Sequence, residues 1–454
     1  MIHESVSSLN NTESVDDLVY TAVFSGDAAT KAEARKQIHL RARRAGAVPS
    51  SIFPLYQAIG RGEVDRLFTV PAFNIRALTY DVARALFRAA MRHDVGPFVF
   101  EIARSEIGYT EQRPGEYAAC VLGAALAEGY RGPVFIQGDH FQASAKKWAT
   151  EDGKAAEIKA LESLIDEALA AEFYNIDIDT STLVDLSFPT RDEQQRINYT
   201  YTAHFMKYIR DRQPKGVHVS IGGEIGEVGK YNTQPDEVRA YIDGVRRALG
   251  GDPGMAKISV QTGTSHGGVP MADGSIAEAK IDFDVLRETT RICRSEYGIA
   301  GSVQHGASTL PESVFNKFPE SEAVEIHLAT GFQNMILDAP SLPGEMKDAI
   351  RAFCFENCTD ERKSGETDEQ FVYKTRKKAI GPFKRRMWEL DAPSKDPIIQ
   401  AIEHKFEFLM DKLAVYGTRD LVERYVKTDT ALPEYAAASA ELTAAAMVDP
   451  NEGE

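Results

Sequence analysis

The chain has 454 residues, of which 43% are hydrophobic and 26% are charged, and its formal net charge is −16 at pH 7. This composition is typical of a soluble protein with one large domain or two, and the acidic charge argues against binding to nucleic acid. We find no apolar stretch long enough to span a membrane, no secretory signal and too few cysteines for a disulfide scaffold. We therefore expect a cytoplasmic protein with no membrane partner.

Residues 1–66 have mostly helical periodicity and include many charged residues, with Pro49 and Pro54 as breaks. We expect them to form a helical extension outside the core.

From residue 67 to residue 338, short apolar runs alternate with longer amphipathic runs. The apolar runs predict eight strands, at Leu67–Phe73, Pro97–Glu101, Pro133–Gln137, Asn175–Asp179, Gly216–Ile221, Ala256–Gln261, Gly301–Gln304 and Ala323–His327. The amphipathic runs predict helices at Tyr80–His93, Ala118–Glu128, Glu157–Ala171, Pro235–Leu249 and Phe283–Tyr297. Repeated βα units in this number predict an α/β fold, a (β/α)8 TIM barrel over residues 67–338. An open, doubly wound sheet is less favoured, because the candidate site residues come from strands far apart in the order.

Residues 339–430 are predicted to form further helices that pack on the barrel, mainly over Gln370–Glu389 and Asp396–Val415. Residues 431–454 are alanine-rich and then acidic, and we expect a flexible tail there.

Four short motifs place metal-binding side chains directly after predicted strands: Gly138-Asp-His140, Gly223-Glu-Ile-Gly226, Thr264-Ser-His-Gly267 and Gln304-His-Gly-Ala-Ser308. His140, His266 and His305, with Glu224, form a ligand set that suits Zn²⁺ or another divalent transition metal. One histidine after a strand is more often structural, but three at strand ends among glycines and hydroxyls favour a ligand role. Asp139 beside His140 could donate or accept a proton.

These motifs, in this order, resemble the class II, metal-dependent fructose-bisphosphate or tagatose-bisphosphate aldolases. The resemblance also includes Val70-Pro-Ala-Phe-Asn74, Asn175-Ile-Asp-Ile-Asp-Thr-Ser181 and the late segment Leu413-Ala-Val-Tyr-Gly417. It covers about residues 67–338, and the N-terminal extension and C-terminal insertions lie outside it.

The resemblance implies a lyase that splits a phosphorylated ketose to dihydroxyacetone phosphate and an aldehyde through a metal-stabilised enediolate. His140, His266 and His305 would hold the metal, Glu224 would be an exchangeable ligand or lie just behind it, and Asp139 would exchange the proton. Asp179 would hold a monovalent cation or orient the site, although a strand-end cap is an equal alternative. Substrate and phosphate would be bound by residues near the strand ends, namely Asn74, Gly267, Gly306, Ala307, Ser308 and Thr330.

Three departures from the family pattern fall in the active-site loops. The family's lysine after the metal histidine is missing beyond Gly267, His327 stands where the family has an asparagine, and the loop after Glu224 lacks the usual acid. We expect Glu227 to substitute for that acid, and Lys230 with His327 to restore the missing positive charge near the substrate.

Two alternatives remain open, a non-catalytic barrel subunit of an aldolase complex and a metal-dependent sugar-phosphate isomerase or epimerase. The retained Asp139 argues against the first, because a purely structural metal site does not need an acid–base group. The family resemblance also suggests a homodimer or homotetramer.

Overall fold

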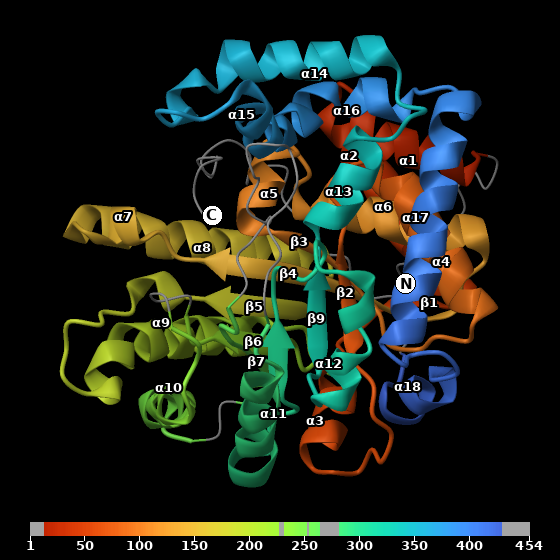
Figure 1. Cartoon of the computed structure of the whole chain (residues 1–454). Helices are drawn as coiled ribbons and strands as arrows, with labels where there is room; N and C mark the ends of the chain where they lie inside the picture. The colour runs from red at the N-terminus through yellow and green to blue at the C-terminus, as the bar shows by residue number, and fades with distance from the viewer. Residues whose placement is uncertain (1–12, 227–230, 252–253, 264–280, 429–454) are drawn as a thin grey trace, which may run out of the picture.

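The computed structural model describes residues 13–226, 231–251, 254–263 and 281–428. Within them, eight parallel strands pair side by side and close into a barrel, because the last strand pairs with the first (Figure 1). The strands are β2 (Val70–Asn74), β3 (Val99–Ala103), β4 (Gly132–Gln142), β5 (Asn175–Asp179), β6 (Ser220–Glu224), β7 (Lys257–Ser259), β8 (Ser302–Gln304) and β9 (Glu325–Leu328). Each overlaps a predicted strand, so the predicted TIM barrel is confirmed.

Helices follow the strands and cover the outside of the barrel. The main ones are α4 (Thr79–Arg92), α6 (Pro114–Glu128), α8 (Glu151–Ala170), α9 (Arg191–Arg212), α10 (Pro235–Leu249), α11 (Phe283–Ile292) and α13 (Thr330–Leu337). The helix α9 was not among the predicted ones, because several of its buried positions are polar, as at Gln195 and Asn198.

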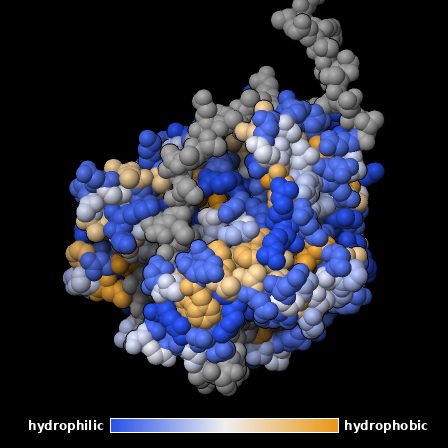
Figure 2. All heavy atoms as spheres, turned by 90° about the horizontal axis from the view of Figure 1, so that it is seen from above, coloured by the Kyte–Doolittle hydropathy of each residue, from blue (hydrophilic) through white to orange (hydrophobic). Residues whose placement is uncertain are grey.

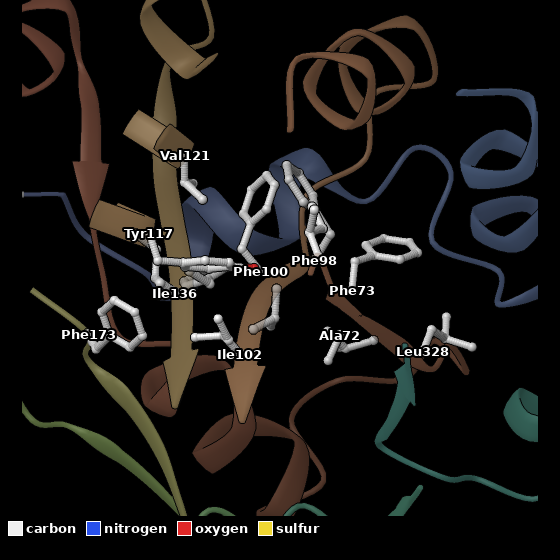
Figure 3. Packing of buried hydrophobic residues seen from close by; sticks show 14 of the residues in the cluster. Ala72, Phe73, Phe98, Phe100, Ile102, Tyr117, Val121, Ile136, Phe173 and Leu328 are labelled. Carbon is white, nitrogen blue, oxygen red and sulfur yellow. The ribbon is translucent and has the colours of Figure 1, made fainter. Parts of the chain in front are cut away.

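Alternating side chains of the strands give the barrel an apolar outer face. Figure 3 shows this packing, in which Phe100 and Ile102 of β3 lie near Tyr117 and Val121 of α6. On β2, the Phe73 ring packs against Phe406, with ring centroids 4.8 Å apart. The core therefore lies mainly between the barrel wall and its helices.

The N-terminal segment contributes to the same core. It comprises α1 (Val15–Phe24), α2 (Ala28–Ala45), β1 (Ala47–Pro49) and α3 (Phe53–Gly60). We expected helices outside the core here, but β1 pairs with the start of β4, and Tyr56 of α3 is fully buried. The Ile52 amide donates to Asn175 Oδ1 at the start of β5 (2.9 Å), and Phe53 packs on His218 just before β6. These contacts place α3 across the N-terminal end of the barrel, the barrel floor, which is at the bottom of Figure 1.

The C-terminal region is helical, as predicted, through α14 (Gly344–Asn357), α15 (Asp368–Thr375), α16 (Ile380–Trp388), α17 (Ala392–Lys412) and α18 (Arg419–Tyr425). On the barrel side, Glu403 of α17 forms an ion pair with Arg88 of α4 (2.6 Å). In Figure 1, α14 and α15 lie at the top, on the side opposite α3. The face seen from that side in Figure 2 is mostly hydrophilic. Among the described residues, no helix is both long and apolar enough to cross a membrane.

Candidate active site and metal centre

A bulge at the end of β4 brings two neighbouring residues, Asp139 and His140, into one site. The pairing of β4 with β5 shifts register between Gly138 and Phe141, and His140 has a φ of +40°. Successive side chains of a regular strand point to opposite faces, whereas a bulge re-aims one of them. Asp139 and His140 can therefore both reach groups at the carboxyl ends of other barrel strands.

The His140 ring lies among groups from four strands. Its Nδ1 is 2.9 Å from Asp179 Oδ2 and 3.1 Å from Glu224 Oε2, and its Nε2 is 4.0 Å from Asp139 Oδ1. The His305 ring lies 4.3 Å away between centroids, and His305 Nε2 is 2.8 Å from the Ser259 hydroxyl. Burial favours the neutral ring, but the Asp139 and Glu224 carboxylates raise the pKa of His140 well above its usual range.

Two groups of possible ligand atoms share His140. One is formed by Asp139, His140 and His305, the other by His140, Asp179 and Glu224, and in each the atoms lie within 4.8 Å of one another. Imidazole nitrogens and carboxylate oxygens in one cluster are the donors that zinc and related divalent metals prefer. The described side chains therefore fit a divalent metal. His266, the third predicted histidine ligand, lies outside the described residues, as do Glu227, Lys230 and Gly267.

Asp179 holds His140 in place. Besides His140 Nδ1, its carboxylate accepts hydrogen bonds from the backbone amide (3.0 Å) and hydroxyl (2.6 Å) of Ser181 and from the Gln142 amide. Burial raises the pKa of a carboxyl group, but the bond to His140 and the other donors keep the pKa of Asp179 below its usual value. A carboxylate behind a metal-binding histidine fixes the ring's orientation and tautomer. Of the three roles considered for Asp179 from the sequence, orienting the site and capping the strand are compatible with these contacts. Binding of a monovalent cation stays a prediction.

The predicted substrate-binding residues lie at the ends of β2, β8 and β9. Asn74 is buried at the end of β2 and donates from Nδ2 to Glu106 Oε2 (2.6 Å). The segment Gly306 to Ser308 follows β8, and the Ser308 hydroxyl accepts a hydrogen bond from the Gly331 amide (3.0 Å), next to Thr330. These two strand ends therefore meet beside His305, while the phosphate contacts themselves remain predictions.

His327 occupies a different setting from the one expected. It lies on β9 with 4% of its surface exposed, and its Nδ1 is 3.0 Å from Glu101 Oε2 and 3.1 Å from Asp139 Oδ1. Its Nε2 is 2.7 Å from Glu325 Oε1. Both ring nitrogens thus face carboxylates inside the barrel, and the predicted contact of His327 with the substrate remains a prediction.

Below the site, the barrel interior is charged. Lys257 Nζ forms ion pairs with Glu325 and with Asp177 Oδ2 (2.9 Å) and donates to Gln137 Oε1 (2.8 Å). TIM-barrel interiors are usually filled with branched apolar side chains, so this arrangement is unusual. This charged interior was not predicted, although the sequence carries a signal for it: polar residues alternate along predicted buried strands, as in Glu325 and His327 or Asp177 and Asp179.

Comparisons with known proteins agree with this architecture. The family model described as "Fructose-bisphosphate aldolase class-II" matches residues 64–408. No curated protein matches. A solved structure of a probable tagatose 6-phosphate kinase from Sinorhizobium meliloti is 16% identical, with a TM-score of 0.52, covering 78% of this chain and 93% of that one.

Two other solved structures illustrate the range of similar proteins. A fructuronate-tagaturonate epimerase from Cohnella laeviribosi is 12% identical with a TM-score of 0.52, covering 77% of this chain and 82% of that one. A fructose-bisphosphate aldolase from Campylobacter jejuni is 16% identical with a TM-score of 0.46, covering 81% and 93%. At these identities the two structures with a TM-score of 0.52 show the fold alone, whereas the family model covers most of the chain. This chain therefore belongs to the class II fructose-bisphosphate aldolase family.

Proposed function

We propose that this protein is a zinc-dependent class II aldolase that reversibly cleaves a phosphorylated ketose to dihydroxyacetone phosphate and an aldehyde. The observation that carries the proposal is the cluster of Asp139, His140 and His305 at the ends of β4 and β8. It combines possible metal ligands with a buried carboxylate in one place, at the end of a barrel where TIM-barrel enzymes have their active sites.

His140 and His305 would hold the metal. Glu224 faces His140 Nδ1, as Asp179 does, so it would act as an outer partner of the ring and would have to move to join the ligand set. A divalent ion bound there supplies a Lewis acid that polarises the ketose carbonyl. Asp179 supports this arrangement because it keeps the His140 ring fixed from behind.

Asp139 would perform the proton transfer. As the carbon–carbon bond breaks, it would accept the proton of the hydroxyl that becomes the aldehyde oxygen, and it would return that proton during condensation. Its burial supports the role, since only 4% of its surface is exposed and little water competes for the proton. The backbone amides of Gly306, Ala307 and Ser308 would bind a phosphate group of the substrate.

A metal-dependent epimerase is a second candidate. It is supported by the similarity in fold to the Cohnella laeviribosi epimerase, with a TM-score of 0.52. The same metal and acid–base group could serve either reaction, because both begin with polarisation of a ketose.

The test is a retro-aldol assay with fructose 1,6-bisphosphate and tagatose 1,6-bisphosphate, with chelator or with added Zn²⁺, coupled to detection of triose phosphate. Chelator-sensitive triose release would support the aldolase and rank the two epimers. An epimerised ketose without triose would favour the second candidate. A metal-loaded protein that changes neither sugar would contradict both for these substrates.

A further inference from the structure

The carboxylate that the proposed function uses for proton transfer is itself held by His327. The bond from His327 Nδ1 to Asp139 Oδ1 (3.1 Å) joins two side chains that are each 4% exposed. Glu101 Oε2 lies 3.0 Å from the same nitrogen, so His327 holds two carboxylates from neighbouring strands. Hydrogen bonds of a buried group have few water competitors, which makes this contact a strong constraint on Asp139.

The other side of the His327 ring is fixed as well. Its Nε2 is 2.7 Å from Glu325 Oε1, and the ring lies against His305 with centroids 4.1 Å apart. An imidazole nitrogen is attracted to a carboxylate when it carries a hydrogen, so this geometry suits a ring that donates from both nitrogens. Such a ring cannot rotate without losing one of its bonds.

Glu325 is anchored in turn. It accepts hydrogen bonds from Lys257, from Gln137 Nε2 (3.1 Å) and from the Tyr56 hydroxyl. Tyr56 belongs to α3, so the contacts run without a break from Asp139 at the site to the barrel floor. We call the residues Tyr56, Lys257, Glu325 and His327 the interior chain.

We infer that His327 is a positioning residue for the proposed reaction: it orients the Asp139 carboxylate for proton transfer, and Glu325 and Lys257 hold His327 in place. This inference rests on the proposed function of Asp139. It gives the interior chain a role beyond stability, since apolar residues of similar volume are often as stabilising as buried ion pairs.

The experiment compares His327→Gln, Glu325→Gln and the double variant with the wild-type enzyme, measuring kcat, KM, the pH–rate profile and bound metal. The matched control is His39→Gln, because His39 is a buried histidine (3% exposed) that bonds Glu172 Oε2 (2.6 Å) away from the site. Tyr56→Phe is a milder change at the far end of the interior chain and removes one hydroxyl only.

We expect His327→Gln to lower kcat about 10- to 100-fold, as losing an outer partner of a site group does, with KM and bound metal changed less than about threefold. Glu325→Gln should act in the same direction, and the double variant should be no worse than His327→Gln, because residues that act as one unit are not additive. The pH–rate profile should move for these variants and remain in place for His39→Gln.

The inference is overturned if wild-type turnover is present and His327→Gln leaves kcat and the pH–rate profile unchanged, or if His39→Gln lowers kcat as much. Absence of wild-type turnover would instead reject the proposed function. In that case, crystal structures of the wild type and of His327→Gln still test the positioning. An altered Asp139 rotamer in His327→Gln supports the positioning role, and an unchanged Asp139 rotamer in that variant overturns it. In Tyr56→Phe, Asp139 should keep its wild-type rotamer.

Discussion

Replacing Lys257 by methionine should destabilise this protein more than any single change to a surface charge. The lysine side chain is 1% exposed and pairs with two carboxylates, Asp177 and Glu325. Methionine has a similar length, so the change leaves little cavity and mainly removes the positive charge. Taking one partner from a buried ion pair costs about 3–5 kcal/mol, because the remaining charge stays buried without compensation.

The deficit should also depend on pH. Burial raises the pKa of Glu325, but Lys257 and His327 outweigh burial and hold this pKa well below its usual value. Glu325 therefore stabilises the folded wild type above about pH 4.3, and this contribution is lost as the pH falls below that value. Burial already raises the pKa of Asp177 despite Lys257. Without the lysine, both carboxyl groups bind protons more readily in the folded state than in the unfolded state. The variant should therefore recover stability as pH falls.

Urea unfolding at pH 8, 7 and 5.5 measures both effects, with Lys207→Met as control. Lys207 forms an exposed pair with Asp211, with side-chain exposures of 68% and 54%, and its loss should cost less than about 1 kcal/mol. A Lys257→Met deficit no larger than that of the control, or one that grows as pH falls, would refute the reasoning. Adding Glu325→Gln to Lys257→Met should restore part of the lost stability, because it removes one uncompensated charge.

Three further predictions concern the site. Asp179→Asn should weaken metal binding about 10- to 100-fold, measured by competition with a chromogenic chelator, because the carboxylate behind His140 is lost; unchanged affinity would show that Asp179 only caps β5. Asp139→Asn should lower kcat at least about 100-fold while bound metal stays the same, and activity retained at the wild-type level would remove Asp139 from the proton transfer. Gly331→Ala should cost about 1–3 kcal/mol and raise the KM of a bisphosphate substrate, because the new Cβ would lie 2.6 Å from the Ser308 carbonyl oxygen; a variant with wild-type melting temperature and KM would contradict it.

Most of the barrel could be predicted from the sequence because its strands are short, apolar and regularly spaced. Runs such as Asn175–Asp179 were located without error, since burial of the outer face and the following helix fix the strand. The strand β1 could not be predicted in the same way. It has three residues and ends at Pro49, and a proline reads as a break in any local pattern.

The candidate site also has a part that could be predicted from the sequence and a part that could not. Motifs at strand ends identified His140 and His305, because glycines around a histidine are visible in the sequence. The partners of His327 were not visible, since Glu101, Lys257 and Glu325 meet only when the barrel closes. Helix α9 was hidden because the first half of its buried face is polar: its buried Asn198 donates to the Glu224 backbone oxygen (2.9 Å), and the apolar positions are confined to the part from Tyr199 onward.

The contact between Tyr56 and Glu325 has a practical consequence for anyone dividing this chain into smaller pieces. The family match begins at residue 64, which invites a shortened version that starts there. Such a fragment would lose Ile52 and the whole of α3, whose Leu55 and Tyr56 are fully buried, and it would remove one hydrogen-bond donor from Glu325. Libraries, fusions and chimaeras built on this barrel should therefore keep residues 47–60 together with the barrel strands, because that segment closes the barrel floor.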